Sequence, residues 1–323
     1  MAFAAGWGDA RLLINSAYLA APDYEIPLAE ELARRGSSIT GWHGRLALSP
    51  KPPVGSAWAL EVWTAPVTIE AASIKDAANA LRAIQRNWGA YQAGYHRRMA
   101  LITERLPPIK PRVLRFPEAA PAGHLGAWTL LDPVTMLASA TTTSPFVNGE
   151  IRFEEDHIGP PSRAYLKFWE ACTRMGAWPG PGDHCIDLGA SPGGWTWAVA
   201  ILGAEVIAID KAPLSPKVSA MPGVSFRRGN AFTEPPSPVD WMICDVIAYP
   251  ERSLEMVVNW IAAGAAKHIV CTLKFQGETD HGSADGFAAI EGGTLAHLCH
   301  NKHELTFMWS ACAPIGPVLP RCP

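Results

Sequence analysis

The 323 residues include 48% hydrophobic and 18% charged residues, a balance that excludes an intrinsically disordered chain and leaves enough apolar surface for a buried core. No apolar run approaches the roughly 18 uncharged residues of a membrane-spanning helix, and the start of the chain lacks the basic region of a secretory signal peptide. The seven cysteines begin at Cys172 and form no C-x-x-C pair. We therefore expect a reduced, cytoplasmic protein without a disulfide framework or zinc ribbon.

The net charge is −3, but basic side chains gather in one strip over residues 82–115. Within this strip Glu104 is the only acidic residue, and the basic ones are Arg82, Arg86, Arg97, Arg98, Arg105, Lys110, Arg112 and Arg115. Local clustering of positive charge can bind a polyanion such as RNA even when the protein is acidic as a whole. A solvated helix face followed by a connector explains the strip equally well.

Residues 1–150 are predicted to form a smaller α+β domain that precedes the second half of the chain. The expected elements, in chain order, are a strand over 11–19, a helix that Pro27 opens and Gly36 ends, strands over 57–71 with a break near Pro66, a helix over 75–91 and a hairpin-like return over 127–153. The proline-rich residues 106–121 should interrupt regular structure.

Residues 151–323 show the alternation of short apolar strands and helical segments that is typical of parallel βαβ units. The expected parallel strands are 184–190, 205–210, 224–230, 239–245 and 268–274. Near the end, residues 294–300 and 303–310 are joined by a connection too short for a parallel crossover, which predicts an antiparallel hairpin. The fold class is therefore α/β, with a doubly wound sheet that binds its ligand at the carboxyl ends of its strands.

The most specific motif is DLGASPGGW, which runs from Asp187 near the end of a strand to Trp195 at the start of a helix. Its spacing is neither G-x-G-x-x-G nor a P-loop, so it favours neither a dinucleotide nor a nucleoside triphosphate. Glycines followed by a helix N-terminus suit a small anion such as a carboxylate, and Asp210 at the end of the next strand suits the two hydroxyls of a ribose. S-adenosylmethionine, a nucleoside that carries an amino-acid carboxylate, meets both requirements. An ordinary tight turn is the alternative for the glycines.

The same motif, continued as DLGASPGGWTW, resembles motif I of the FtsJ-like ribose 2′-O-methyltransferases. The resemblance extends over about 144–310 and is carried by SPF (144–146), PSRAYLKFWEA (161–171), CDVIAYPE (244–251), TLKFQG (272–277) and HELTFMW (303–309). Within the family, the pattern is most similar to that of the bacterial 23S rRNA cytidine 2′-O-methyltransferases. This resemblance implies a Rossmann-like sheet with an antiparallel C-terminal hairpin, preceded by a THUMP-like RNA-binding domain.

The resemblance also implies a set of site residues. A Lys-Asp-Lys-Glu tetrad falls on Lys167, Asp245, Lys274 and Glu304. The expected S-adenosylmethionine-binding residues are Ser162, Gly189, Ser191, Pro192, Gly193, Gly194, Trp195, Asp210, Asn230 and Asp245. Asn230 stands where the family often has aspartate, and it either reads the adenine edge or satisfies its own turn.

The positions of the tetrad residues carry information independent of the resemblance. Asp245 and Lys274 end predicted parallel strands at the ligand-binding edge of the sheet. Lys274 follows the apolar run HIVCTL, so its ammonium is expected to be partly desolvated and able to act as general base for a ribose 2′-hydroxyl. Taken alone, Lys167 more simply pairs with Glu170 on its helix, and Glu304 is more simply a solvated hairpin residue.

These observations predict an S-adenosylmethionine-dependent RNA methyltransferase that modifies a ribose 2′-hydroxyl, with 23S rRNA as the favoured substrate and no need for a metal or a membrane. The same chemistry on tRNA or an mRNA cap is the nearest alternative. A non-catalytic RNA-binding or ribosome-assembly factor and a small-molecule O-methyltransferase are alternatives from other classes. His297, His300 and His303 cluster in the sequence, but a hairpin would direct them to alternating faces rather than to one metal ion.

Overall fold

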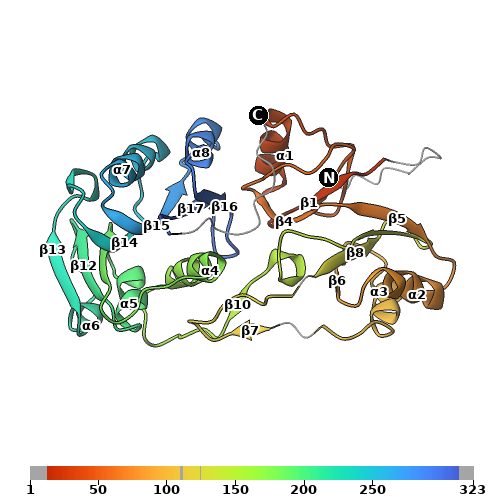
Figure 1. Cartoon of the computed structure of the whole chain (residues 1–323), viewed down its shortest axis with the longest axis horizontal. Helices are drawn as coiled ribbons and strands as arrows, with labels where there is room; N and C mark the ends of the chain where they lie inside the picture. The colour runs from red at the N-terminus through yellow and green to blue at the C-terminus, as the bar shows by residue number, and fades with distance from the viewer. Residues whose placement is uncertain (1–12, 110–111, 124, 313–323) are drawn as a thin grey trace.

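The molecule has two lobes side by side, and the longest axis runs through both (Figure 1). The computed structural model describes residues 13–109, 112–123 and 125–312. One lobe is built on a seven-stranded sheet, and the other on two four-stranded sheets from the first part of the chain. No helix in these described ranges is long and apolar enough to cross a membrane.

The N-terminal lobe contains two sheets, each with its own helices. The first has the strand order β2-β3-β1-β4, and its elements are β1 (Ser16–Ala20), α1 (Glu25–Arg34), β2 (Gly41–His43), β3 (Leu46–Ser49) and β4 (Ala59–Trp63). The second has the order β5-β9-β8-β6, and its elements are β5 (Pro66–Glu70), α2 (Ile74–Ile84), β6 (Trp88–Ala90), α3 (His96–Thr103), β8 (Gly126–Leu130) and β9 (Thr135–Ser139). The expected α+β character is confirmed, but as two small sheets.

The expected helix over 75–91 is too long, because α2 ends at Ile84. Gln85 adopts an extended backbone, and Trp88 belongs to β6. The indole of Trp88 packs in the same apolar cluster as Leu81, so it continues the helical spacing without continuing the helix. Its Nε1 donates hydrogen bonds to the carbonyls of Leu81 (2.9 Å) and Gln85 (3.0 Å). The carbonyl of Leu81 also accepts the N–H of Gln85 (3.2 Å), so the indole ties the last turn of the helix to the start of β6.

Two other expected elements of this lobe shift by a few residues. The strand expected over 11–19 is β1, and the helix expected to open at Pro27 already begins at Glu25; residues 11 and 12 lie outside the described ranges. Between the lobes, a short parallel pair joins β7 (Val113–Leu114) to β10 (Arg152–Phe153), with the 3₁₀ turn η1 (Val147–Gly149) just before β10. The division of the chain at residues 150 and 151 stays a prediction.

The second lobe has the strand order β13-β12-β11-β14-β15-β17-β16. The first five of these strands are parallel to one another, and β17 is antiparallel to both of its neighbours, β15 and β16. The strands are β11 (His184–Leu188), β12 (Glu205–Asp210), β13 (Val224–Arg228), β14 (Val239–Cys244), β15 (Ala266–Lys274), β16 (Gly293–Ala296) and β17 (Glu304–Ser310). This mixed seven-stranded sheet confirms the predicted α/β class and the antiparallel end of the sheet.

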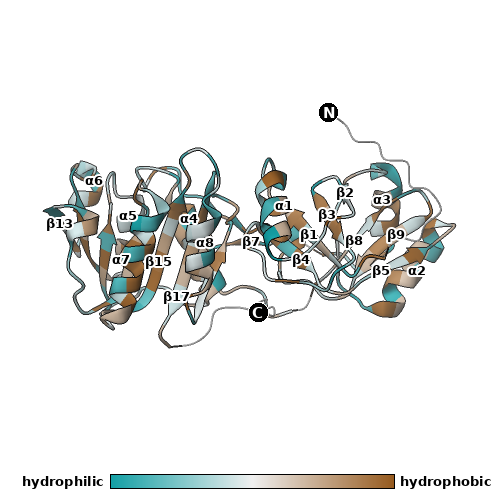
Figure 2. Ribbon diagram, turned by 90° about the horizontal axis from the view of Figure 1, so that it is seen from above, coloured by the Kyte–Doolittle hydropathy of each residue, from teal (hydrophilic) through white to brown (hydrophobic). Residues whose placement is uncertain are grey.

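Helices cover both faces of this sheet, and apolar residues concentrate on the strands between them (Figures 1 and 2). One apolar cluster joins the sheet to α4 and α5, and another joins it to α7 and α8. The helices are α4 (Tyr165–Met175), α5 (Gly194–Ala200), α6 (Pro216–Ser219), α7 (Pro250–Ala262) and α8 (His281–Ala288), and the 3₁₀ turn η2 is Ala231–Thr233. The near-continuous apolar character of the strands follows from this burial on both sides.

The expected hairpin strand over 294–300 is shorter than predicted, because β16 ends at Ala296. Residues 297–303 form the connection to β17 instead, so the three clustered histidines do not lie on the hairpin strands. The N–H of His297 donates to the carbonyl of Ala57 (2.6 Å), and the N–H of Cys299 donates to Oε2 of Glu170 (2.9 Å). These partners lie outside the hairpin. They hold residues 297–303 away from the hydrogen bonds that pair β16 with β17.

The two lobes share one apolar cluster, which contains residues of β1, α1 and β4 together with residues of β15, β17 and α8. Trp58 is fully buried at this seam, and its ring lies 5.8 Å from that of Phe275, which directly follows β15. At the edge of this shared cluster, Nε2 of His281 lies 3.0 Å from Oε2 of Glu30. The shared cluster anchors the first N-terminal sheet against the edge of the large sheet where β15 ends.

Glu61 on β4 gives the N-terminal lobe a testable pH dependence. Its side chain is buried at 0% exposure, accepts one hydrogen bond from Trp63 (3.0 Å), and has its pKa raised by burial from 4.5 to about 8. The folded protein therefore holds this proton between those values while the unfolded chain releases it, so stability falls as pH rises.

We expect the Glu61→Gln variant to gain stability relative to the parent by about 1.4 kcal/mol for each pH unit between 4.5 and 8. Urea unfolding at several pH values measures this difference. The exposed Glu70→Gln variant on β5 is the control, and its stability should follow that of the parent. Parallel stability curves for parent and Glu61→Gln would contradict the assignment of a buried, protonated Glu61.

Candidate active site

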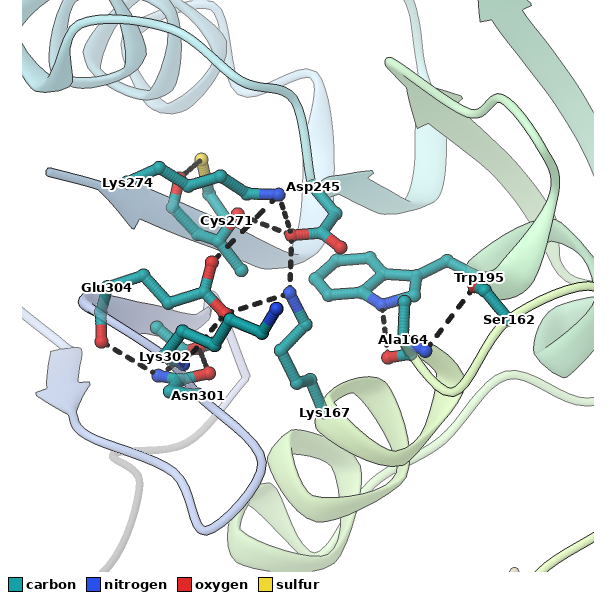
Figure 3. A network of polar contacts seen from close by, with 12 residues as sticks. Ser162, Ala164, Lys167, Trp195, Asp245, Cys271, Lys274, Asn301, Lys302 and Glu304 are labelled. Carbon is teal, nitrogen blue, oxygen red and sulfur yellow. Dashed lines mark hydrogen bonds and ion pairs between the residues drawn. The ribbon is translucent and has the colours of Figure 1, made fainter. Parts of the chain in front are cut away.

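The four residues of the predicted tetrad meet at one edge of the large sheet, although they come from four separate elements (Figure 3). Nζ of Lys167 lies 2.8 Å from Oδ1 of Asp245 and 3.0 Å from Oε1 of Glu304. Nζ of Lys274 lies 3.0 Å from the same oxygen of Asp245 and 3.9 Å from Oε2 of Glu304. The four side chains therefore form one network of alternating charges.

The topology of the sheet explains this meeting. Lys274 is the last residue of β15, and Asp245 directly follows the parallel strand β14, so both side chains reach the carboxyl edge. Glu304 is the first residue of the antiparallel strand β17 and stands opposite Lys274 in the register. Lys167 enters from the buried face of α4.

The two lysines differ in their surroundings. The side chain of Lys167 is 8% exposed and that of Lys274 is 21% exposed. Burial lowers the pKa of Lys167, but the carboxylates of Asp245 and Glu304 outweigh it, and the pKa is raised above its usual value. Lys167 is therefore a fixed ammonium ion that bridges two carboxylates, whereas Lys274 faces the more open side of the network.

The simpler interpretations, in which Lys167 pairs with Glu170 and Glu304 is solvated, are both wrong. Glu170 is fully buried and pairs with Arg174, whose Nε and Nη2 lie 3.0 and 2.8 Å from Oε1, so it does not pair with Lys167. Glu304 is buried rather than solvated. Both residues that looked ordinary in isolation belong to the buried part of the tetrad.

Two further residues support the tetrad, and sequence reasoning missed both. Thr272 donates from Oγ1 to Oδ1 of Asp245 (2.8 Å); it lies two residues before Lys274, and period-two alternation puts both on one face of the strand. Asn301 is buried and donates from Nδ2 to the carbonyl of Glu304 (3.2 Å). The position of Thr272 was a usable signal, whereas Asn301 lies in a connection whose shape the sequence does not indicate.

The glycines of the loop after β11 are required by the packing of the loop itself. Gly189 has φ +82°, and a Cβ there would lie 2.6 Å from Cβ of Val246. Gly193 has φ +109°, and a Cβ on Gly194 would lie 2.8 Å from Oγ of Ser162. The close approaches hold the loop against the segment that follows Asp245 and against the entry to α4.

Asp210 and the loop are tied together at the carboxyl edge. Oδ2 of Asp210 accepts a hydrogen bond from the N–H of Ser191 (3.0 Å), and Oδ1 accepts one from the N–H of Ala212 (2.9 Å). Pro192 joins the loop to the next segment, since its carbonyl accepts the N–H of Ser215 (3.0 Å). The Asp210 carboxylate is thus fixed in place beside the glycine loop.

Three residues near this loop have structural contacts of their own. Trp195 is buried and donates from Nε1 to the carbonyl of Ala164 (2.8 Å) at the start of α4. Oδ1 of Asn230 accepts the N–H of Phe232 (3.2 Å), which is the geometry of the turn interpretation. Asp187 accepts Oγ1–H of Thr196 (2.6 Å), and burial raises its pKa to about 7. A role of Trp195 or Asn230 in cofactor binding stays a prediction.

The clustered histidines show no convergence on a metal. His297 is buried, and burial lowers its pKa to about 4, while its Nε2 lies 3.0 Å from the carbonyl of Lys302. In the described part of the chain, no group of three or more His, Cys, Asp or Glu side chains is arranged to hold a metal ion.

The chain is similar in sequence to several known proteins. A relative from Halorhodospira halophila named Ribosomal RNA large subunit methyltransferase M is 38% identical over 157 residues, which cover 45% of this chain and 46% of the relative. Proteins of the same name from Laribacter hongkongensis and Alkalilimnicola ehrlichii are 34% identical over 174 residues and 32% identical over 209 residues. These two matches cover 48% and 60% of this chain and 49% and 58% of the relatives.

The chain thus spans about half the length of the curated relatives it matches. Residues 160–278 match the family model described as FtsJ-like methyltransferase. This range contains α4, the glycine loop, Asp210, Asp245 and Lys274, and β17 with Glu304 follows it. Residues 160–278 of this chain therefore belong to the FtsJ-like methyltransferase family.

Proposed function

We propose that the chain is an S-adenosylmethionine-dependent RNA methyltransferase that acts on a ribose 2′-hydroxyl, with 23S rRNA as the favoured substrate. The observation that carries this proposal is the position of Lys274, which shares Oδ1 of Asp245 with the buried Lys167 at the carboxyl edge of the sheet. The relatives named Ribosomal RNA large subunit methyltransferase M support rRNA as the substrate class.

The polar groups of the site suit S-adenosylmethionine. Each oxygen of the Asp210 carboxylate accepts one backbone N–H and keeps lone pairs for a ribose hydroxyl. The loop from Gly189 to Gly194 brings backbone close to the same edge. When bound, S-adenosylmethionine supplies an electrophilic methyl group on its sulfonium. The residues that would hold it are Asp210, the glycine loop and the segment at Asp245.

The protein's own task is then to orient the acceptor hydroxyl and to remove its proton. Lys274, once deprotonated, accepts the 2′-hydroxyl proton on Nζ as general base. The permanent ammonium of Lys167 holds Asp245 and Glu304 in place, with both contacts at 3.0 Å or less. Asp245 in turn fixes Nζ of Lys274, and Glu304 lies within reach of it at 3.9 Å.

Only part of the basic strip over residues 82–115 supports RNA binding. Arg112 pairs with Glu118, and Arg115 pairs with Glu154, so these arginines carry local partners. Lys110 lies outside the described ranges. The arginines that remain exposed on or beside α2 and α3 are Arg82, Arg86, Arg97 and Arg105. In our proposal this end of the N-terminal lobe, which lies far from α4, β15 and β17 in Figure 1, binds a distant segment of a large RNA in the manner of a THUMP-like module.

A methyl-transfer assay tests the proposal. The parent protein is incubated with methyl-labelled S-adenosylmethionine and 23S rRNA that lacks its natural modifications, and tRNA and capped mRNA are assayed in parallel. We expect label in 23S rRNA. Label in tRNA or capped mRNA instead would assign that RNA as the substrate. A protein that binds RNA but labels none of these substrates would support the alternative of a ribosome-assembly factor.

The Asp210→Ala variant tests the cofactor site. We expect at least a tenfold loss of affinity for S-adenosylmethionine and S-adenosylhomocysteine in calorimetry, because a hydrogen bond to a charged group contributes about 1.5–3 kcal/mol. The exposed Glu205→Ala variant at the other end of β12 is the control and should bind both as the parent does. Unchanged affinity in Asp210→Ala would remove Asp210 from the site.

A further inference from the structure

The tetrad leaves one electrostatic requirement of an RNA substrate unmet. With both lysines protonated its charges balance, and with Lys274 deprotonated as general base the tetrad is negative; each lysine already contacts both carboxylates. Each ribose in RNA carries a phosphodiester on the carbon next to its 2′-hydroxyl. A 2′-hydroxyl placed at Lys274 therefore brings a negative charge to the rim of a cluster that has no net positive charge, and a cation outside the tetrad must compensate for it.

Lys302 is a cation at this rim. It lies two residues before Glu304, its side chain is exposed, and Figure 3 shows that side chain extending toward the tetrad. Within residues 13–109, 112–123 and 125–312, its ammonium has no carboxylate within ion-pair distance, in contrast to Lys167, Lys274 and Arg163. The ammonium is thus available to an external anion.

The backbone of Lys302 is held firmly although its side chain is exposed. Its carbonyl accepts the N–H of Glu304 (2.7 Å) and lies 3.0 Å from Nε2 of His297. Because burial keeps His297 neutral at ordinary pH, with a pKa of about 4, Nε2 can carry the proton and donate. The N–H of Lys302 also points to Oε1 of Glu304 at 3.5 Å. The position of Lys302 is therefore coupled to that of Glu304.

Both lobes fix the connection that carries Lys302. The N–H of His297 donates to Ala57 of the N-terminal lobe (2.6 Å), and the His297 ring stacks on Trp58 at 5.2 Å. The N–H of Cys299 donates to Glu170 on α4 (2.9 Å). A connection held at these points presents Lys302 at a defined place beside the tetrad rather than on a loose loop.

We propose that Lys302 binds the phosphodiester on the 3′ side of the ribose that is methylated, and thereby positions the 2′-hydroxyl at Lys274. A lysine ammonium is a compact point charge, which suits a phosphate approached from one side. This inference rests on the proposed function, and it assigns to Lys302 a contact with the substrate that the tetrad residues do not make.

The test compares Lys302→Gln with Lys302→Arg and with the control Lys267→Gln. Lys267 is exposed and lies at the opposite end of β15 from Lys274, so its variant removes the same charge far from the tetrad. Methyl transfer is measured over a range of RNA and salt concentrations, and the affinity for S-adenosylmethionine is measured by calorimetry.

For Lys302→Gln we expect the KM for RNA to rise about tenfold with cofactor affinity unchanged. The slope of log kcat/KM against log salt should become shallower by about 0.7–1, which corresponds to one lost phosphate contact. Lys302→Arg should restore most of the parent KM and slope, and Lys267→Gln should match the parent.

Two outcomes separate this inference from the function on which it rests. An active parent whose salt slope and KM are unchanged in Lys302→Gln overturns the assignment of Lys302 alone. Weakened cofactor affinity in Lys302→Gln also overturns it, because the ammonium would then serve the cofactor rather than the RNA. A parent that transfers no methyl group to any RNA overturns the proposed function and this inference with it.

Discussion

The Lys274→Ala variant should lose turnover by about 10²–10⁴-fold, because the variant lacks the group that accepts the 2′-hydroxyl proton. Its affinity for S-adenosylmethionine should equal that of the parent, since Lys274 contacts Asp245 and Glu304 rather than the glycine loop. The measurement is single-turnover methyl transfer at saturating cofactor and RNA.

The control for this variant is Lys267→Ala, on the same strand but at its opposite end, which should keep parental turnover. Circular dichroism checks that each variant is folded. Because the four tetrad residues form one network, a double variant of Lys274 and Glu304 should be little worse than Lys274→Ala alone. Near-parental turnover in Lys274→Ala would show that another group takes the proton.

The Lys167→Ala variant should lose both activity and stability. Lys167 is the bridge between two carboxylates, its side chain is only 8% exposed, and its removal leaves buried negative charge without its main partner. Breaking a buried ion pair by removing one partner costs about 3–5 kcal/mol. We therefore expect a loss of this size in the free energy of unfolding, measured with urea, together with a large loss of turnover.

The contrast between the two lysines is the informative part of this experiment. Lys274 is more exposed, so Lys274→Ala should be destabilised far less than Lys167→Ala. Lys267→Ala serves again as the surface control. If Lys167→Ala unfolds at the same urea concentration as the parent, Lys167 is not the structural centre of the tetrad, and its buried contacts contribute little to stability.

The sequence was sufficient to predict the large sheet and the residues at its edge. Parallel strands buried on both faces give continuous apolar runs, as in the segment before Lys274, and such runs reveal both the strand and its end. Because the carboxyl ends of parallel strands share one edge, Asp245 and Lys274 could be expected near each other. The short final connection also predicted that β16 and β17 are antiparallel to each other. It did not predict that β17 lies beside β15, the pairing that places Glu304 opposite Lys274.

Contacts between distant segments were not predictable in the same way. The sequence gives no local sign that Glu170 accepts the N–H of Cys299, or that the N–H of His297 donates to the carbonyl of Ala57 across the seam. These contacts shorten β16 and shape the connection that carries Asn301 and Lys302. The overlong helix over 75–91 has a similar cause, because Trp88 packs like a helical residue while belonging to a strand.

The central claim is methylation of a ribose 2′-hydroxyl in RNA, and nucleoside mass spectrometry tests it most directly. Ribosomal RNA from a strain that lacks this gene is compared with rRNA from its parent, and the deletion strain is complemented with the parent gene or with Lys274→Ala. The account predicts that one 2′-O-methylated nucleoside of 23S rRNA disappears on deletion, returns with the parent gene and stays absent with Lys274→Ala. An unchanged set of 2′-O-methylated nucleosides, or the loss of a base-methylated one instead, would contradict it.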